Sequence, residues 1–127
     1  MEIIDVNAGI PGPAEWFTGD VTLRPIATPG RASILRVHFE PRARTAWHTH
    51  PVGQTLHVIE GTARVQSAGG AVTAVPAGET VRFAPGESHW HGAGPDQAMT
   101  HIAIQESDDA GSSAAWAEHV SDEQYDG

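Results

Sequence analysis

Residues 54–83 read QTLHVIEGTARVQSAGGAVTAVPAGETVRF, and this stretch decides the fold class. It contains four short runs rich in apolar and β-branched residues, at 54–60, 62–66, 71–75 and 79–83. The runs are separated by glycine and proline residues, namely Gly61, Gly69-Gly70 and Pro76-Ala77-Gly78. Short β-prone runs between such breakers predict strands joined by tight turns.

The same pattern extends on both sides of this stretch. Residues 31–39 alternate with period two, which places Leu35, Val37 and Phe39 on one face of a strand. Residues 99–105 form the last clear strand, and no run of roughly ten residues in this region has helical periodicity. A chain of 127 residues with many short strands predicts one all-β domain, either a sandwich or a barrel.

Three regions follow from this pattern. Residues 1–30 contain four prolines and are predicted to form an N-terminal arm with one strand near 21–24. Residues 31–106 form the predicted barrel core, and residues 107–127 form a C-terminal tail. The tail is rich in acidic residues and lacks arginine, and we expect Trp116 to anchor it on the barrel or on a neighbouring subunit.

The overall composition excludes several classes of protein. The formal net charge is −9, and because such an acidic surface repels phosphate, nucleic acid is not an expected partner. The chain has seven arginines but no lysine or cysteine, which excludes Schiff-base lysines, thiolate nucleophiles and disulfides. No apolar run approaches the roughly 20 residues that span a bilayer, and residues 1–5 lack the features of a signal peptide. We therefore expect a cytoplasmic protein without a membrane partner.

Eight histidines are present, and most of them lie between His48 and His101. His48-Thr49-His50 places two imidazoles two residues apart, so in an extended strand they point to the same face, about 7 Å apart. His89-Trp90-His91 repeats this spacing later in the chain. A barrel can bring histidines from two strands around one ion, so the pattern predicts a metal site. The isolated histidines are interpreted as surface or hydrogen-bonded residues, namely His38, His57 and His119.

The sequence resembles the cupin superfamily in two motifs. The first motif keeps its spacing at His48, His50, Gln54 and Gly61. It departs from the family pattern at Arg42, where glycine is usual, and at Gln54, where glutamate is usual. The second motif keeps Gly78, Gly86 and His89. Its proline is shifted by one position to Pro85, and Ala93 stands where asparagine is usual. The resemblance implies a cupin fold, a jelly-roll barrel also called a double-stranded β-helix.

A closer resemblance is to small bacterial cupins that include manganese-dependent hydroxynitrile lyases. It is carried by residues 46–56, 89–92 and 99–106, and near the two ends by residues 16–19 and 120–125. The resemblance implies a metal held by His48, His50, Gln54 and His89. It also implies a small-molecule substrate in a cavity lined by the candidate catalytic residues His91, His101 and Gln105. Cupins of this size are usually homodimers or homotetramers, and we adopt that expectation here.

Gln54 is the informative departure from the family pattern. Three neutral imidazoles and an amide oxygen leave the double positive charge of a divalent ion uncompensated. Such a site is expected to bind its metal less tightly than one with a carboxylate, but to polarise a bound oxygen more strongly. Nitrogen and oxygen ligands suit manganese, iron, nickel or zinc, and the resemblance favours manganese.

The last strand places four residues on one face, namely Met99, His101, Ala103 and Gln105. If this face lines the barrel interior, His101 and Gln105 point into an otherwise apolar cavity, where an imidazole can move a proton near neutral pH. Alternatively, the two side chains only satisfy each other or backbone groups. The cavity shape is expected to depend on Leu35, Val37, Leu56, Val58 and Phe83.

These observations favour a metal-dependent lyase that cleaves or forms a carbon–carbon bond in cyanohydrins. In that reaction a cavity histidine takes the hydroxyl proton, and the metal stabilises negative charge on oxygen or on the departing cyanide. A metal-dependent oxygenase, a non-catalytic domain that binds a small ligand, and an isomerase or cyclase are the alternatives.

Overall fold

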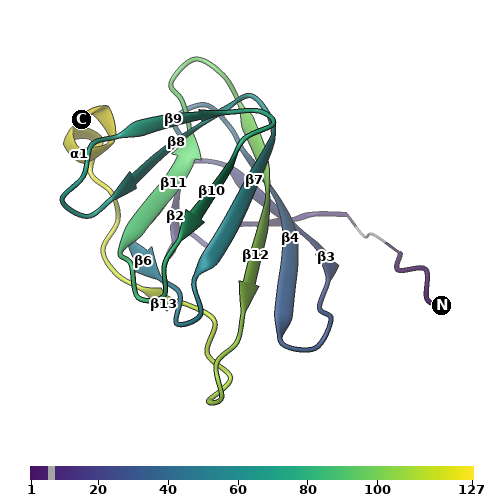
Figure 1. Cartoon of the computed structure of the whole chain (residues 1–127). Coiled ribbons are helices and arrows are strands. Elements are labelled where there is room, and N and C mark those ends of the chain that lie inside the picture. Colours follow the sequence, from purple (N-terminus) through teal and green to yellow (C-terminus); the bar gives the residue numbers. More distant parts are fainter. Residues whose placement is uncertain (6–7) are drawn as a thin grey trace.

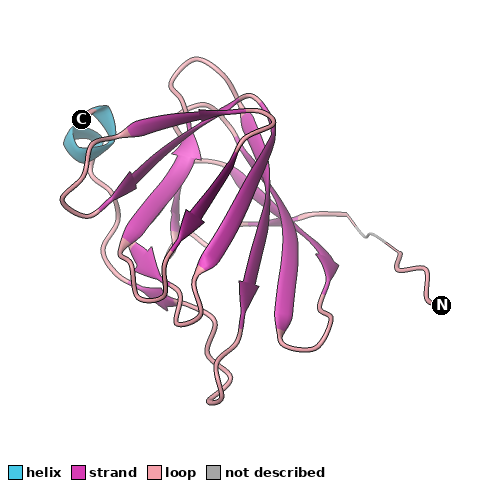
Figure 2. Ribbon diagram, viewed as in Figure 1, coloured by secondary structure: helices cyan, strands magenta, loops and turns pink. Residues whose placement is uncertain are grey.

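The strands form two curled sheets that face one another across the core (Figure 1; Figure 2). Alternation of apolar and polar residues along the strands gives each sheet an apolar inner face. The computed structural model describes residues 1–5 and 8–127. Its strands are β1 (Ile10–Pro11), β2 (Phe17–Thr18), β3 (Val21–Ala27), β4 (Ala32–Phe39), β5 (Arg44–Thr45), β6 (His48–Thr49), β7 (Gln54–Glu60), β8 (Thr62–Ser67), β9 (Thr73–Pro76), β10 (Thr80–Phe83), β11 (His89–Ala93), β12 (Met99–Glu106) and β13 (Ala115–Trp116). A short helix, α1 (Asp122–Asp126), follows β13. Neither α1 nor any other described segment forms a helix with the length and apolar character that a membrane crossing requires.

The chain passes repeatedly from one sheet to the other. The first sheet has the strand order β1-β3-β4-β12-β7-β10, and the second has the order β13-β6-β11-β5-β2. Strands β8 and β9 extend the second sheet, because β8 pairs with β11 and β9 pairs with β8. Residues that are distant in sequence therefore meet between the sheets. This arrangement confirms the predicted all-β barrel.

Side chains from both sheets fill the space between them. Phe39, Leu56 and Val58 of the first sheet have no exposed surface, and Ala63 and Val65 of β8 belong to the same core cluster. Along β12, alternate residues point inward, as the period of a strand requires. The inward set, namely Met99, His101, Ala103 and Gln105, is buried. Two polar residues of β12 therefore face the barrel interior.

The positions of most strands agree with the sequence. The four runs predicted between residues 54 and 83 are confirmed as β7, β8, β9 and β10, with ends that differ by at most two residues. The first 30 residues differ from the prediction of one strand, because β1 and β2 accompany β3. Each has only two residues, too few to show alternation, and each forms through its pairing with β3 or β5. The region boundaries at residues 30 and 106 stay a prediction, and β3 pairs with β4 across the first of them.

The turn between β7 and β8 is closely packed around Gly61. Its φ angle is +71°, and a Cβ atom there would collide with the carbonyl oxygen of Ala98. Gly69 has a φ angle of +80° but open space around its Cα. Alanine at positive φ costs about 1–2 kcal/mol, so Gly69→Ala should lower the free energy of unfolding by that amount. Gly61→Ala adds the collision and should lower it by at least about 3 kcal/mol in urea denaturation. Equal losses in the two variants would contradict this account.

Candidate metal centre

Three buried histidines meet between the two sheets. His48 begins β6, His50 follows that strand, and His89 begins β11. His48 and His89 are direct partners in the antiparallel pairing of β6 with β11. One nitrogen atom from each of the three rings lies within 4.8 Å of the other two. The structure therefore brings together three of the four residues predicted as metal ligands, and we call them the histidine triad.

Each ring of the histidine triad is oriented by a hydrogen bond from its Nδ1 atom. The Nδ1–H group donates to a backbone carbonyl in every case, from His48 to Ala46 at 2.9 Å, from His50 to Ser113 at 2.7 Å and from His89 to Glu87 at 2.8 Å. With the proton on Nδ1, the Nε2 atom of each neutral ring carries a free lone pair. Nε2 of His50 is buried and has no hydrogen-bond partner among the described residues. In metal-binding histidines, the ring nitrogen that does not bind the metal commonly donates such a hydrogen bond, which fixes the orientation of the ring.

Gln54 adds an amide oxygen to the three imidazoles. Its Nε2 group donates to Oε1 of Gln105 at 3.1 Å, so its own Oε1 is free to face the histidines. That oxygen lies 3.1 Å from Nε2 of His89. Because His89 carries its proton on Nδ1, the contact brings two acceptors together, and a shared cation would stabilise it. Three nitrogen donors and one oxygen donor fit a divalent transition-metal ion.

Burial keeps the three rings of the triad neutral. It lowers the pKa of His48 well below the usual value of 6.5, and the charge of His89 acts in the same direction. Burial also lowers the pKa of His50, and it lowers the pKa of His89 to about 4. The lone pairs are therefore available at neutral pH, which coordination of a metal by histidine requires.

A second pair of histidines adjoins the triad. Nε2 of His101 in β12 lies 3.1 Å from Nδ1 of His91 in β11, and both rings are buried. The ring centroids of His91 and His48 are 5.2 Å apart. Burial lowers the pKa of His91 well below 6.5 and the pKa of His101 to about 4. Nε2 of His91 and Nδ1 of His101 have no partner among the described residues.

Both groups of residues open into one cavity of about 510 Å³. Six of the seven predicted site residues line it, namely His48, His50, Gln54, His91, His101 and Gln105. His89 lies just outside the lining, stacked on Phe83 with a centroid distance of 3.6 Å. His101 and Gln105 do not satisfy each other, because His101 contacts His91 and Gln105 contacts Gln54. The polar residues predicted to face the interior therefore surround a single space.

The apolar lining of the cavity differs in part from the prediction. Leu35 and Val37 line it, whereas Leu56, Val58 and Phe83 do not. These three side chains point into the barrel, as alternation requires, but they pack in the hydrophobic core and not against the cavity. Trp16 and Trp116 line the cavity as well, with ring centroids 5.1 Å apart. They come from opposite ends of the chain, so no spacing in the sequence connects them.

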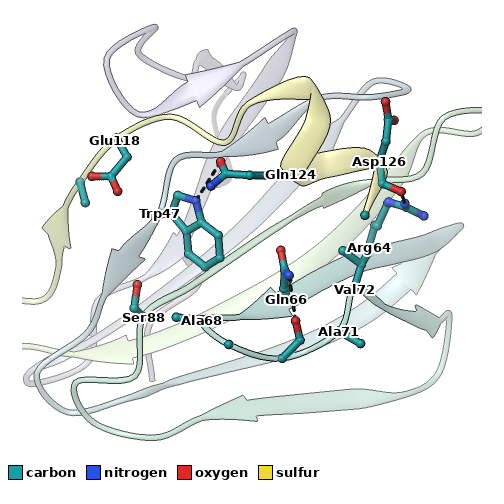
Figure 3. A pocket seen from close by; sticks show the side chains of 14 residues that line it. Trp47, Arg64, Gln66, Ala68, Ala71, Val72, Ser88, Glu118, Gln124 and Asp126 are labelled. Atoms are coloured by element: carbon teal, nitrogen blue, oxygen red, sulfur yellow. Dashed lines mark hydrogen bonds between the residues drawn. The ribbon is translucent and has the colours of Figure 1, made fainter.

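A larger groove of about 810 Å³ lies between residues 68–72, which join β8 to β9, and the C-terminal tail (Figure 3). Nε1 of Trp47 donates to Oε1 of Gln124 at 3.4 Å beside this groove, and Figure 3 marks this hydrogen bond with a dashed line. The residues that line it include no histidine and no cluster of buried titratable groups. The smaller inner cavity is therefore the candidate site.

The isolated histidines lie away from the cavity, as interpreted from the sequence. His57 and His119 are exposed. His38 is partly buried and forms hydrogen bonds with Thr100 at 2.7 Å and Glu40 at 3.1 Å.

A small β-barrel with a histidine cluster between its sheets defines a single-domain cupin. Residues 35–104 match the cupin domain family, and the chain therefore belongs to that family. It is 55% identical to the (R)-mandelonitrile lyase of Granulicella tundricola over 98% of either chain. The crystal structure of a cupin-like protein from Thermotoga maritima, 33% identical, has a TM-score of 0.86 over 98% of this chain and 95% of that one. The polyketide cyclase RemF of Streptomyces resistomycificus, 24% identical, shares the fold with a TM-score of 0.70 over 99% of this chain and 91% of that one. The cupin fold implied by the two motifs is confirmed.

The buried histidines make the stability of the metal-free protein depend on pH. The pKa of His101 is about 4 in the folded protein against 6.5 for a free histidine, so unfolding takes up a proton between these values. The contribution of His101 to the free energy of unfolding is fully present above pH 6.5. It is lost as the pH drops toward 4, by up to about 1.4 kcal/mol per pH unit. We expect His101→Gln to remove this contribution in urea denaturation at about pH 5, while about pH 8 serves as the internal control. The same pH dependence of stability in the variant and the wild type would contradict the lowered pKa of His101.

Proposed function

We propose that the protein is a metal-dependent lyase that cleaves or forms the carbon–carbon bond of cyanohydrins, as a hydroxynitrile lyase does. The observation that carries the proposal is that the histidine triad with Gln54 and the His91–His101 pair adjoin one cavity. Cyanohydrin cleavage removes a proton from the hydroxyl group and releases a cyanide ion from the carbon. It therefore needs a proton acceptor and an electrophilic centre in one small cavity. The identity of 55% to an (R)-mandelonitrile lyase supports the same reaction.

The proposed metal ligands are His48, His50, Gln54 and His89. When bound, a divalent ion would stabilise the negative charge that develops on the substrate oxygen or on the departing cyanide. Manganese is the ion that we propose, with iron, nickel and zinc as the alternatives that the same donors accept. Elemental analysis of the purified protein distinguishes them, since manganese favours the lyase and zinc counts against a redox reaction.

His91 and His101 form the proposed proton relay. One ring donates across their 3.1 Å contact and the other accepts. In either tautomer, one of the two free nitrogens, Nε2 of His91 or Nδ1 of His101, carries a lone pair and the other carries a proton. The lone pair takes the hydroxyl proton while the electrons of the carbon–carbon bond leave with cyanide, and the relay returns a proton to cyanide. The products are an aldehyde and hydrogen cyanide.

Gln105 is the third residue to which we assign a direct role. Its Oε1 accepts the hydrogen bond from Gln54 and so directs the Gln54 oxygen toward the triad. Because its side chain also lines the cavity, its amide N–H groups are placed to donate to the substrate. Gln105 therefore links the orientation of a metal ligand to the orientation of the substrate.

We further propose a cytoplasmic homodimer or homotetramer that acts on a small molecule. Large apolar side chains are exposed in the N-terminal region, namely Met1, Ile3, Ile4 and Ile10. Removal of such side chains from water stabilises association between subunits. The net charge of −9 argues against nucleic acid as a partner. Light scattering in solution measures the number of subunits.

The proposed reaction is tested by aldehyde release from mandelonitrile, with and without manganese. We expect turnover by the manganese-loaded protein and a fall in kcat of at least about 100-fold in His101→Ala, because proton transfer by a positioned side chain contributes that much. His57→Ala, at an exposed position, is the matched control and should keep wild-type activity. No turnover above buffer in the loaded wild-type protein would contradict the lyase. Oxygen consumption with an enolic or aromatic substrate would instead favour the oxygenase.

Gln54→Glu tests the role of the neutral oxygen ligand. A carboxylate would compensate part of the charge of the ion, so the affinity for manganese should rise about tenfold, equivalent to about 1.4 kcal/mol. The kcat for cyanohydrin cleavage should fall, because the compensated ion polarises the substrate less. Calorimetric titration measures the affinity, and the mandelonitrile assay measures kcat. Weaker binding of manganese, or an unchanged kcat, would show that the charge of the ligand does not have this role.

A further inference from the structure

His50 differs from the other two histidines of the triad in the origin of its hydrogen-bond partner. The other two rings donate to carbonyl groups that lie two residues earlier in the same segment. Nδ1 of His50 instead donates to the carbonyl oxygen of Ser113, at 2.7 Å. Ser113 belongs to the C-terminal tail, residues 107–127. The orientation of one ring of the triad therefore depends on a distant segment of the chain.

The tail runs along β6, the strand that begins with His48. Strand β13 pairs with β6, with Trp116 opposite His48. The Trp116 ring also stacks on the His48 ring, with a centroid distance of 4.5 Å and an interplanar angle of 30°. The backbone of Trp47 continues this pairing through hydrogen bonds with residues 117 and 118. Residues 111–114 line the cavity, so the tail forms part of its wall.

Tyr125 anchors the tail on the barrel. It lies in α1 and is fully buried, and its hydroxyl donates to the carbonyl oxygen of Ala93 at 2.6 Å. Three guanidinium groups lie 4.7–5.0 Å from the centroid of its ring, those of Arg42, Arg44 and Arg64. Cation–π contacts of this kind stabilise the packing of an aromatic ring. Three of the seven arginines in the chain thus converge on one residue of the tail.

All three of these arginines also bind the tail through its oxygen atoms, and Arg42 donates to the carboxylate of Asp126 at 3.4 Å. Arg44 is only 3% exposed, and it donates to the carbonyl of Val120 and to the carboxylate of Asp122, both at 2.8 Å. Arg64 donates to the backbone carbonyls of residues 125 and 126, at 2.9 and 3.1 Å. Hydrogen bonds from a charged donor are among the stronger ones in proteins. The acidic tail is therefore held by the barrel at several points, with Tyr125 at their centre.

We propose that Tyr125 is a positioning residue for the metal centre. By anchoring the tail, it keeps the Ser113 carbonyl where Nδ1 of His50 donates to it, and so keeps Nε2 of His50 directed at the other ligands. Loss of the anchor loosens the tail and shifts the Ser113 carbonyl and the part of the cavity wall at 111–114, although the pairing of β13 with β6 still holds the middle of the tail. The effect on metal affinity rests on the proposed function, whereas the effect on the orientation of His50 does not.

The test compares Tyr125→Ala and Tyr125→Phe with Glu123→Gln, a matched control at an exposed position of the same helix. The first measurement is nitrogen NMR of the metal-free protein, which reports the tautomer of each imidazole. Tyr125→Ala should shift His50 away from its Nδ1–H tautomer, while His48 and His89 keep theirs. Tyr125→Phe retains the ring among the arginines and should cause a smaller shift in the same direction, and Glu123→Gln should cause none.

The second measurement is the Kd for manganese by calorimetric titration. We expect the Kd to rise about tenfold or more in Tyr125→Ala, as for other residues that orient a metal ligand. An unchanged His50 signal in folded Tyr125→Ala would overturn the proposal. If that variant does not fold, Tyr125→Phe decides, and an unaltered His50 signal there overturns the proposal equally. A wild-type protein that binds no manganese would contradict the proposed function, and the NMR measurement would still decide the role of Tyr125.

Discussion

The hydrogen bonds from Nδ1 of three imidazoles to backbone carbonyls are the interactions on which the candidate site depends. They decide which nitrogen of His48, His50 and His89 carries the proton, and therefore which lone pairs face one another. Burial acts in the same direction, because it lowers the pKa of each ring and keeps the charged form rare at neutral pH. The geometry and the protonation state of the triad therefore have the same origin in the fold.

The passage of the chain between two sheets places the remaining chemistry around the triad. The second sheet contributes His48 and His89 as cross-strand partners, and the first contributes Gln54, His101 and Gln105 from β7 and β12. Neither sheet alone contains both the proposed donors for an ion and the proposed proton relay. Because the polar side chains around this space are buried, electrostatic interactions among them are stronger than at the surface. The site therefore requires the complete barrel.

Short-range patterns in the sequence predicted the strands and a metal site between two His-x-His pairs, because alternation and this spacing act within a few residues. The choice of His89 as the third histidine ligand came from the resemblance to cupins. The identity of the apolar lining was predicted less well. Leu56 and Val58 face inward as alternation requires, but whether an inward residue meets the core or the cavity depends on the opposite sheet. The contact of Ser113 with His50 joins residues 63 positions apart and uses only a backbone carbonyl, so no residue type marks it. Trp116 was expected to anchor the tail, yet its stacking on His48 follows from pairing that sequence does not show.

In the proposed function, three neutral imidazoles converge on one divalent ion. Pulsed electron paramagnetic resonance of the manganese-loaded protein tests this claim most directly, because nitrogen atoms bound to the ion modulate its signal. With isotope-labelled histidine, we expect couplings from the three rings of the triad, and from two rings in His50→Ala. A spectrum with proton couplings from water alone, as for the ion free in solution, would contradict the claim.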